Sequence, residues 1–360
     1  MKKPFFYSKI SVMKYWIITY GCQMNVSDSE KVASVLENHG YGPASKENGA
    51  DLIAINMCSV RQSAVNRAYA KINKYYKTKK IILAGCILQV DKKKLRDKVS
   101  EFWHPDKYFE CLLKHQGKFS AFVPIMTGCN NFCAYCVVPH TRGREISRKA
   151  DEIIKEVKSL VKKDYSQRDK SLFHPSLCSG KEITLLGQNV NSYKDRGINF
   201  SKLLKKINTL KQDFRLNFLT SHPKDMSDEL IETMAQCQKL TKEIHLPVQS
   251  GDNQILKKMN RHYTAQQYKN LIKKIRQKIP GIKISTDIIV GFPGETKKQF
   301  QNTLKLCKEI KFNKAYIARY SLRPGTPAAK LKDNVSLQEK KHRWQILENL
   351  INKKHVKKNV

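Results

Sequence analysis

The chain has 360 residues, 40% of them hydrophobic, and its 68 Lys and Arg outnumber its 31 Asp and Glu to give a formal net charge of +37. This length and composition favour roughly two folded domains, exclude a wholly disordered chain, and indicate a polyanionic partner such as nucleic acid. A lysine-rich proteome would produce the same charge, so charge alone is weak evidence for that partner.

The start of the chain predicts neither export nor a membrane anchor. Residues 1–15 carry four lysines and lack a continuous apolar core, and no window approaches the roughly 18 apolar residues of a spanning helix. We therefore expect a cytoplasmic protein that has no membrane contact. In a reducing cytosol, the ten cysteines are more typical of metal ligands or catalysts than of disulfides.

The first part of the chain alternates between strand and helix patterns. Strands are predicted at 15–20, 52–56 and 81–84, with one helix opening at a Ser27/Glu30 capping box and another near Arg61. This βαβαβ order predicts a parallel sheet. The stretch 91–118, interrupted by Trp103, His104 and Pro105, is interpreted as a short connection.

A cysteine follows each of these strands: Cys22, Cys58 and Cys86. The carboxyl ends of parallel strands lie along one edge of the sheet, which is where ligands bind in such folds. The three thiols are therefore predicted to meet at one site, and simple packing is the alternative.

The second part of the chain predicts an open or partial (β/α) barrel of six strands with helices between them. The predicted strands are 122–126, 182–186, 214–219, 243–248, 282–290 and 315–320. Helices are predicted at 150–161 and 264–278, a polar inserted loop at 162–180, and a basic helix and tail from Leu337. That tail contains Lys340, Lys341, His342 and Arg343.

Three cysteines follow the first of these strands closely, as Cys129-x3-Cys133-x2-Cys136. Thiolates suit zinc or iron–sulfur clusters, but structural zinc usually takes four protein ligands. Three cysteines on a 4Fe–4S cube would leave one iron open to a substrate or cofactor. A zinc site remains the alternative at this point.

This loop, with Tyr135 before its last cysteine, resembles the signature of the radical S-adenosylmethionine (SAM) superfamily. The wider chain is similar to the methylthiotransferases, and within them to the branch that forms 2-methylthio-N6-dimethylallyladenosine in tRNA. The resemblance covers about 14–350 and depends on the motifs at 19–25, 137–145, 186–191, 246–251, 259–261, 285–296 and 320–328.

The resemblance implies an α/β fold in which an N-terminal parallel-sheet domain (14–118) precedes a radical SAM partial (β/α)6 barrel (119–336). Members of the family usually add a C-terminal TRAM barrel that grips tRNA. We expect that domain to be missing, with only the basic helix and tail at 337–360 in its place. The N-terminal domain is short for the family and is expected to lack its last strand and helix.

The resemblance also implies two 4Fe–4S clusters and SAM as cofactors. Cys129, Cys133 and Cys136 would hold the cluster that cleaves SAM to a 5′-deoxyadenosyl radical. Cys22, Cys58 and Cys86 would hold an auxiliary cluster that supplies or carries the sulfur. We count all six cysteines as catalytic. The implied partners are the tRNA anticodon stem-loop, SAM and an electron donor such as flavodoxin or ferredoxin.

Several strand-end residues are candidates for binding SAM: Tyr135, Gln188, Gln249, Asp287 and Gly291. The two glutamines are placed to hydrogen-bond SAM, and the Gly291 turn is expected to present backbone amides to its adenine or ribose. Asp287 lies within a strand and would need a partner if buried. Ordinary loop polarity and structural roles remain the alternatives for these residues.

The predicted function is addition of a methylthio group to C2 of N6-isopentenyladenosine next to the anticodon. One alternative is a methylthiotransferase acting on threonylcarbamoyl-adenosine in tRNA or on a ribosomal-protein aspartate. Another is a non-catalytic RNA-binding iron–sulfur protein, and a third is a zinc-dependent nucleic-acid module.

Overall fold

The computed structural model describes residues 12–109, 111, 120–162 and 181–353. Residues 1–11 and most of the predicted insertion, 163–180, lie outside this description. The chain divides into two compact units, 1–116 and 117–360. Over the described ranges, every helix is too short or too polar to cross a bilayer.

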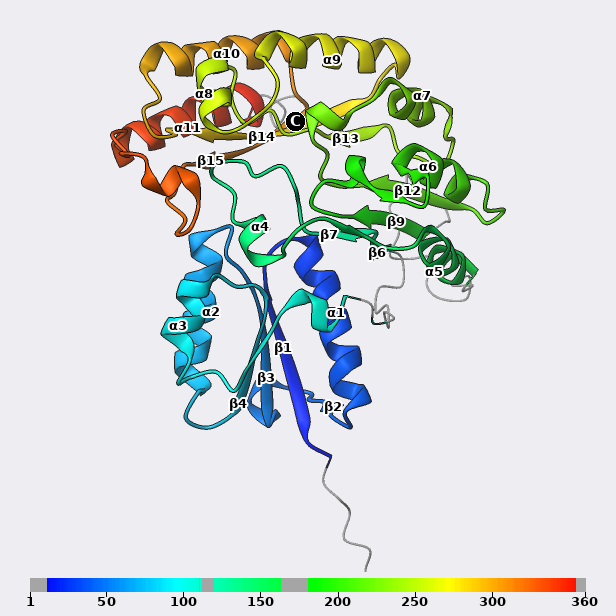
Figure 1. The fold of residues 1–360 in the computed structure, drawn as a ribbon, viewed down its shortest axis with the longest axis vertical. Coiled ribbons are helices and arrows are strands. Elements are labelled where there is room, and N and C mark those ends of the chain that lie inside the picture. Colours follow the sequence, from blue (N-terminus) through cyan, green and yellow to red (C-terminus); the bar gives the residue numbers. More distant parts are fainter. Residues whose placement is uncertain (1–11, 110, 112–119, 163–180, 354–360) are drawn as a thin grey trace, which may run out of the picture. The chain divides into compact units, whose positions relative to one another are not determined.

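The first unit is a parallel five-stranded sheet in the order β2-β1-β3-β4-β5, with α1 on one face and α2 and α3 on the other (Figure 1). Its elements are β1 Lys14–Tyr20, α1 Gln23–Asn38, β2 Gly42–Pro43, β3 Leu52–Cys58, α2 Gln62–Tyr75, β4 Lys80–Cys86, α3 Gln89–Leu95 and β5 Glu101–Trp103. The predicted parallel sheet is confirmed.

Side-chain alternation along the two central strands builds the core of this unit on both faces of the sheet. Ile53 and Ile55 of β3 pack with α2, whereas Leu52 and Ala54 pack with α1. All seven residues of β3 are buried, as is typical of a strand between two helical layers.

Two sequence predictions for this unit are wrong. Helix α1 begins at Gln23 directly after Cys22, because the Asn25 side chain accepts the Cys22 N–H and supplies the cap that was assigned to Ser27. The stretch after Cys86 is not a mere connection, because it contains helix α3 and strand β5, and β5 completes the sheet by pairing with β4 through Trp103 and Ala84.

The second unit confirms the partial barrel. Its two parallel three-stranded sheets, β6-β9-β12 and β13-β14-β15, are linked by an isolated bridge between Leu216 and Leu240. The strands are β6 Ser120–Pro124, β9 Lys181–Leu186, β12 Phe214–Phe218, β13 Glu243–His245, β14 Lys283–Val290 and β15 Lys314–Arg319. One hydrophobic core runs through both sheets and the helices outside them.

The helices of this unit alternate with the strands in chain order, and all except the short α4 and α8 pack on the core from the outer face of the sheets (Figure 1). They are α4 Val138–Thr141, α5 Ala150–Lys162, α6 Phe200–Asn208, α7 Asp228–Gln236, α8 Asn253–Lys258, α9 Ala265–Lys278, α10 Lys297–Ile310 and α11 Leu337–Ile351. Two short antiparallel strand pairs, β7 Met126–Thr127 with β8 Ile146–Ser147 and β10 Lys194–Asp195 with β11 Ile198–Asn199, complete the unit.

The C-terminal helix is an integral part of this unit, not a separate basic tail. Leu347 and Ile351 of α11 belong to the main core. Two of its basic residues, Lys340 and Arg343, are only 2% and 3% exposed. These side chains therefore stabilise the barrel and are not available to RNA.

Candidate cluster and cofactor sites

The sheet brings the first three cysteines to one edge. Cys58 and Cys86 end β3 and β4 as direct register partners, and Cys22 follows β1, the strand on the other side of β3. Cys58 and Cys86 are buried, whereas Cys22 is exposed. Cys86 and Cys22 both lie close enough to raise the pKa of Cys58, which supports the predicted meeting of the three thiols.

A buried polar network fixes the Cys22 turn beneath this edge. The Asn25 amide donates to Asn56 Oδ1 at 2.7 Å, and the Asn56 amide donates to Asn25 O at 2.9 Å and to Ser29 Oγ at 3.1 Å. Gly85 lies against the network, where a Cβ would come within 2.3 Å of Asn56 Oδ1. Packing therefore allows only glycine at the position before Cys86.

These three thiols are suited to binding a cationic cluster, because their thiolate forms are disfavoured when no positive group is bound. A hydrogen bond to Cys86, burial and the neighbouring sulfurs raise the pKa of the Cys58 thiol, so three adjacent thiolates need a positive partner. Within the described residues, no three His, Cys, Asp or Glu side chains are placed to hold a single metal ion. A 4Fe–4S cube instead takes its thiolates on separate irons.

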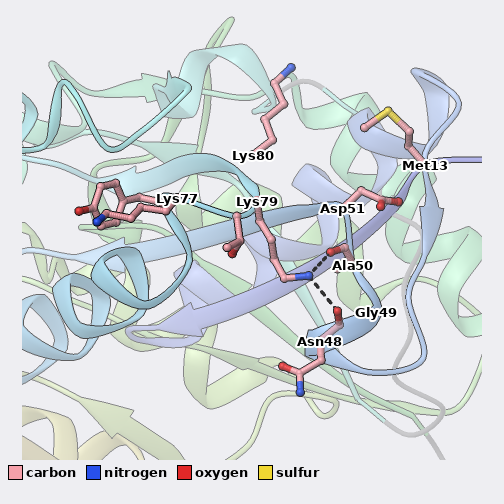
Figure 2. A pocket seen from close by; sticks show the side chains of 10 residues that line it. Met13, Asn48, Gly49, Ala50, Asp51, Lys77, Lys79 and Lys80 are labelled. Atoms are coloured by element: carbon pink, nitrogen blue, oxygen red, sulfur yellow. Dashed lines mark hydrogen bonds between the residues drawn. The ribbon is translucent and has the colours of Figure 1, made fainter.

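The open pocket shown in Figure 2 belongs to the opposite edge of this sheet. Its lining includes Asp51 before β3 and Lys80 at the start of β4, which are the amino ends of strands whose carboxyl ends carry the cysteines. Lys79 there donates to the carbonyls of Asn48 and Ala50. The pocket is therefore separate from the thiol site.

In the second unit, the three-cysteine loop leaves β7 and is pinned at its start. Cys129 N donates to Gly143 O at 3.3 Å, near the strand β8 that pairs with β7. Gly128 has φ +76, and a Cβ there would lie 1.9 Å from Arg144 O. This position accepts only glycine, because both the backbone conformation and the space exclude a side chain.

The segment Met259-Asn260-Arg261 holds the rest of this loop. Met259 O accepts the Ala134 N–H at 2.9 Å, and the Asn260 amide donates to Phe132 O at 3.0 Å. The motif was visible in the sequence, but its partners lie more than a hundred residues away in the chain. Sequence reasoning therefore gave it no role.

Two hydrogen-bond donors point at sulfur atoms of the loop. The Asn131 amide lies 3.5 Å from Cys129 Sγ, and Arg261 Nη1 lies 3.6 Å from Cys133 Sγ. Burial raises the pKa of Cys129 despite its contacts with Asn131, so a cluster iron would be needed to favour the thiolate. A thiolate triad with N–H donors on its sulfurs fits the outer shell of an iron–sulfur site.

We predict that Gly128→Ala halves the iron content by displacing this loop. The matched control is Gly143→Ala, because Gly143 has nearly the same φ, +75, but open space around its Cβ position. Both variants carry the backbone strain, and only Gly128→Ala adds the clash with Arg144 O. Iron and sulfide analysis after anaerobic reconstitution measures the effect, and equal losses in both variants would contradict the packing argument.

Buried polar atoms that have no protein partner gather at the carboxyl ends of the barrel strands. Among the described residues, they include Thr127 Oγ1, Gln188 Oε1, Asn189 Oδ1, both amide atoms of Asn191, Ser221 Oγ and Gln249 Oε1. Buried polar groups normally find partners. These atoms therefore fit a polar ligand such as SAM, and Gln188 and Gln249 are among them as predicted residues.

Gln249 carries a second indication of a functional position. It has φ +69, a left-handed conformation that few residues other than glycine adopt and that is concentrated at functional sites. Its N–H donates to Asp287 O at 2.9 Å, which fixes the strand end that presents its side chain.

The Gly291 turn is closed by Glu295, whose Oε2 accepts the Gly291 N–H at 2.7 Å. This amide is thus used within the turn, so a contact of Gly291 with SAM has to use another atom. A Cβ at Gly291 would come within 2.3 Å of Lys340 Cγ, so α11 packs directly on the turn.

The other two predicted SAM contacts lie in different surroundings. Tyr135 is half-buried and, like Ile289, packs against a small cluster that includes Ala134 and Phe292. The Asp287 side chain, which is 39% exposed, has its Oδ2 3.3 Å from His245 Nε2. Asp287 is therefore not buried, and it nevertheless has a polar neighbour in His245.

Both units of the chain match known protein families. Residues 123–307 match the Radical SAM superfamily, and residues 14–103 match the uncharacterized protein family UPF0004. TsrM from Kitasatospora setae, a radical SAM methyltransferase, has a similar fold with a TM-score of 0.62 at 11% identity, covering 89% of this chain and 75% of TsrM. The fold and the three-cysteine loop define a radical SAM protein.

Closer relatives narrow this class. The tRNA-2-methylthio-N(6)-dimethylallyladenosine synthase of Syntrophomonas wolfei is 42% identical, covering 93% of this chain and 81% of the relative. The enzymes of that name from Clostridium perfringens and Dictyoglomus thermophilum are 41% and 42% identical, each covering 96% of this chain and 83% and 84% of the relatives. This chain belongs to that family of methylthiotransferases, whose cofactors are SAM and iron–sulfur clusters.

Proposed function

We propose that the chain adds a methylthio group to C2 of N6-isopentenyladenosine next to the anticodon of tRNA. The observation that carries this proposal is the second thiol triad, because radical formation from SAM requires only the three-cysteine loop of the barrel. A separate triad on a supported sheet edge is what a reaction that also delivers sulfur requires. The names of the relatives point to the same substrate.

Each group of residues has one task in this proposal. Cys129, Cys133 and Cys136 bind one cluster, and Cys22, Cys58 and Cys86 bind the other. When bound, the first cluster supplies the electron that cleaves SAM, and the second supplies sulfur. Gln188 and Gln249 use their unpartnered oxygens to orient SAM, and Tyr135 and Gly291 shape the surrounding wall.

The partners follow from charge and chemistry. Lys and Arg contacts to phosphate supply affinity for the stem-loop, and the target base is reached in a single-stranded loop where its edge is open. Electrons come from a small reduced carrier such as flavodoxin or ferredoxin, and the reaction takes place in the cytoplasm.

The test incubates the anaerobically reconstituted chain with SAM, a reductant and an anticodon stem-loop that carries N6-isopentenyladenosine. Mass spectrometry should show a methylthio group in place of hydrogen on that base. Modification only of a threonylcarbamoyl-adenosine stem-loop or of a ribosomal protein would assign the chain to another branch. Absence of 5′-deoxyadenosine would favour a non-catalytic RNA-binding protein.

Binding of this stem-loop should depend steeply on salt. Neutralised phosphates release counterions, so the affinity should fall about tenfold or more between 50 and 200 mM salt. Fluorescence anisotropy on the reconstituted chain measures this, and a flat response would contradict the role of the positive charge. Lys341→Met should lower the slope slightly, because Lys341 is exposed on α11.

A further inference from the structure

A polar and aromatic cluster occupies the face of β13, β14 and β15 that is turned away from the outer helices. Asp287 of β14 is the direct register partner of Tyr316 of β15, and His245 of β13 is the partner of Ser285. The intervening residues Ile284 and Ile288 belong to the core beneath the helices. Alternation along the strand therefore places the whole cluster on the inner face of the barrel.

The cluster is ordered by its own contacts. His245 Nε2 lies 3.3 Å from Asp287 Oδ2, and His245 Nδ1 lies 3.0 Å from Ser285 Oγ. The rings of His245 and Tyr316 meet edge to face at 5.6 Å. His245 is thus held from both nitrogens and fixes the orientation of the Asp287 carboxylate.

Two members of the cluster remain open to a ligand. Tyr316 is 48% exposed, which is unusual for a ring in the middle of a strand, and the Asp287 side chain is 39% exposed. The cluster therefore offers an aromatic face beside a carboxylate that is anchored on one side and accessible on the other.

Its position relative to the radical chemistry follows from strand geometry. Ile289, two residues after Asp287 and on the same face, packs against the cluster of Ala134 and Tyr135 in the three-cysteine loop. Two residues of strand span about 6.6 Å, so Asp287 lies one pleat repeat below that loop. A base held there would lie next to the end of the barrel where SAM is cleaved.

We propose that this cluster binds the target adenine, with Tyr316 stacking on the base and Asp287 accepting its N6–H. An N6-alkylated adenine retains one N6–H, and a carboxylate accepts from such an exocyclic amine while repelling a carbonyl oxygen at the same position. His245 is a positioning residue for Asp287. The inference rests on the proposed function and assigns Asp287 to the substrate instead of to SAM.

The test compares binding of two stem-loops by the reconstituted full chain, one with N6-isopentenyladenosine and one with inosine at the target position. Tyr316→Ala should weaken binding of the first stem-loop about tenfold, as expected for loss of a stacking partner. Asp287→Asn should lower the preference for the first stem-loop over the inosine stem-loop about tenfold, because the amide can donate to the inosine oxygen. SAM affinity should remain unchanged in both variants.

Two exposed sites provide matched controls. Asp228→Asn removes a carboxylate from a surface ion pair with Lys274, and Leu337→Ala removes the 77% exposed Leu337. Neither control should alter RNA selectivity.

Wild-type affinity in Tyr316→Ala together with wild-type selectivity in Asp287→Asn would overturn the adenine site alone, as would an equal loss of SAM affinity. A wild-type chain that binds both stem-loops equally would overturn the adenine site, and absence of the methylthiolated product would overturn the proposed function.

Discussion

Replacement of Cys22, Cys58 and Cys86 together by Ala is expected to lower the iron content from about eight to about four per chain. The variant should still convert SAM to 5′-deoxyadenosine, because the loop Cys129–Cys136 and its supports lie in the other compact unit. It should form no methylthiolated RNA, because the reaction then lacks its site for sulfur. The change therefore separates radical formation from sulfur insertion.

The first unit should remain folded in this variant. The Asn25–Asn56–Ser29 network and both apolar faces of the sheet stay in place when three small side chains are shortened. Cys111→Ala is the matched control, since Cys111 lies in the same unit away from the three strand ends. Unchanged iron content or continued formation of product in the triple variant would refute the assignment of the auxiliary cluster.

Arg343→Met is expected to destabilise the protein by about 3–5 kcal/mol, the typical cost of leaving a buried charge unpaired. Arg343 Nη1 donates to Glu295 Oε2 at 2.7 Å, and the two side chains are 3% and 1% exposed. The same Glu295 oxygen accepts the Gly291 N–H, so the ion pair also holds the strand-end turn. SAM affinity should therefore fall along with the free energy of unfolding.

Urea unfolding and SAM titration under anaerobic conditions measure these two effects. Lys341→Met removes a positive charge from the exposed side of the same helix, two residues before the buried Arg343, and should change neither quantity appreciably. The double variant Arg343→Met/Glu295→Gln should lose less stability than the sum of the single variants, because it removes both charges. Additive losses would show that the pair does not act as a unit.

The sequence predicted the elements of both units well, because buried apolar residues recur with the short period of a strand or a helix. All six predicted barrel strands and the three main strands of the first unit are present. The structure has Cys58 and Cys86 as the last residues of their strands and Cys22 just after its own, close to the predicted placement, since a strand end is a local feature. The predicted start of the first helix was wrong. Asn25 caps the helix at Cys22, so it begins before the Ser27 that the pattern indicated.

The tertiary structure decided which residues support the two sites. The contacts of Asn260 and Arg261 with the cysteine loop join residues 128 apart, and local patterns carry no information on such partners. It also placed Asp287 beside His245 and buried Lys340 and Arg343, which by composition belonged to a basic surface. The sequence thus predicted the loop cysteines from their close spacing, the other three thiols from their place at strand ends, and the class of chemistry from the resemblance of these motifs to a family. The partners that orient them were decided only by folding, since ion pairs and hydrogen bonds form wherever distant strands and helices bring charges together.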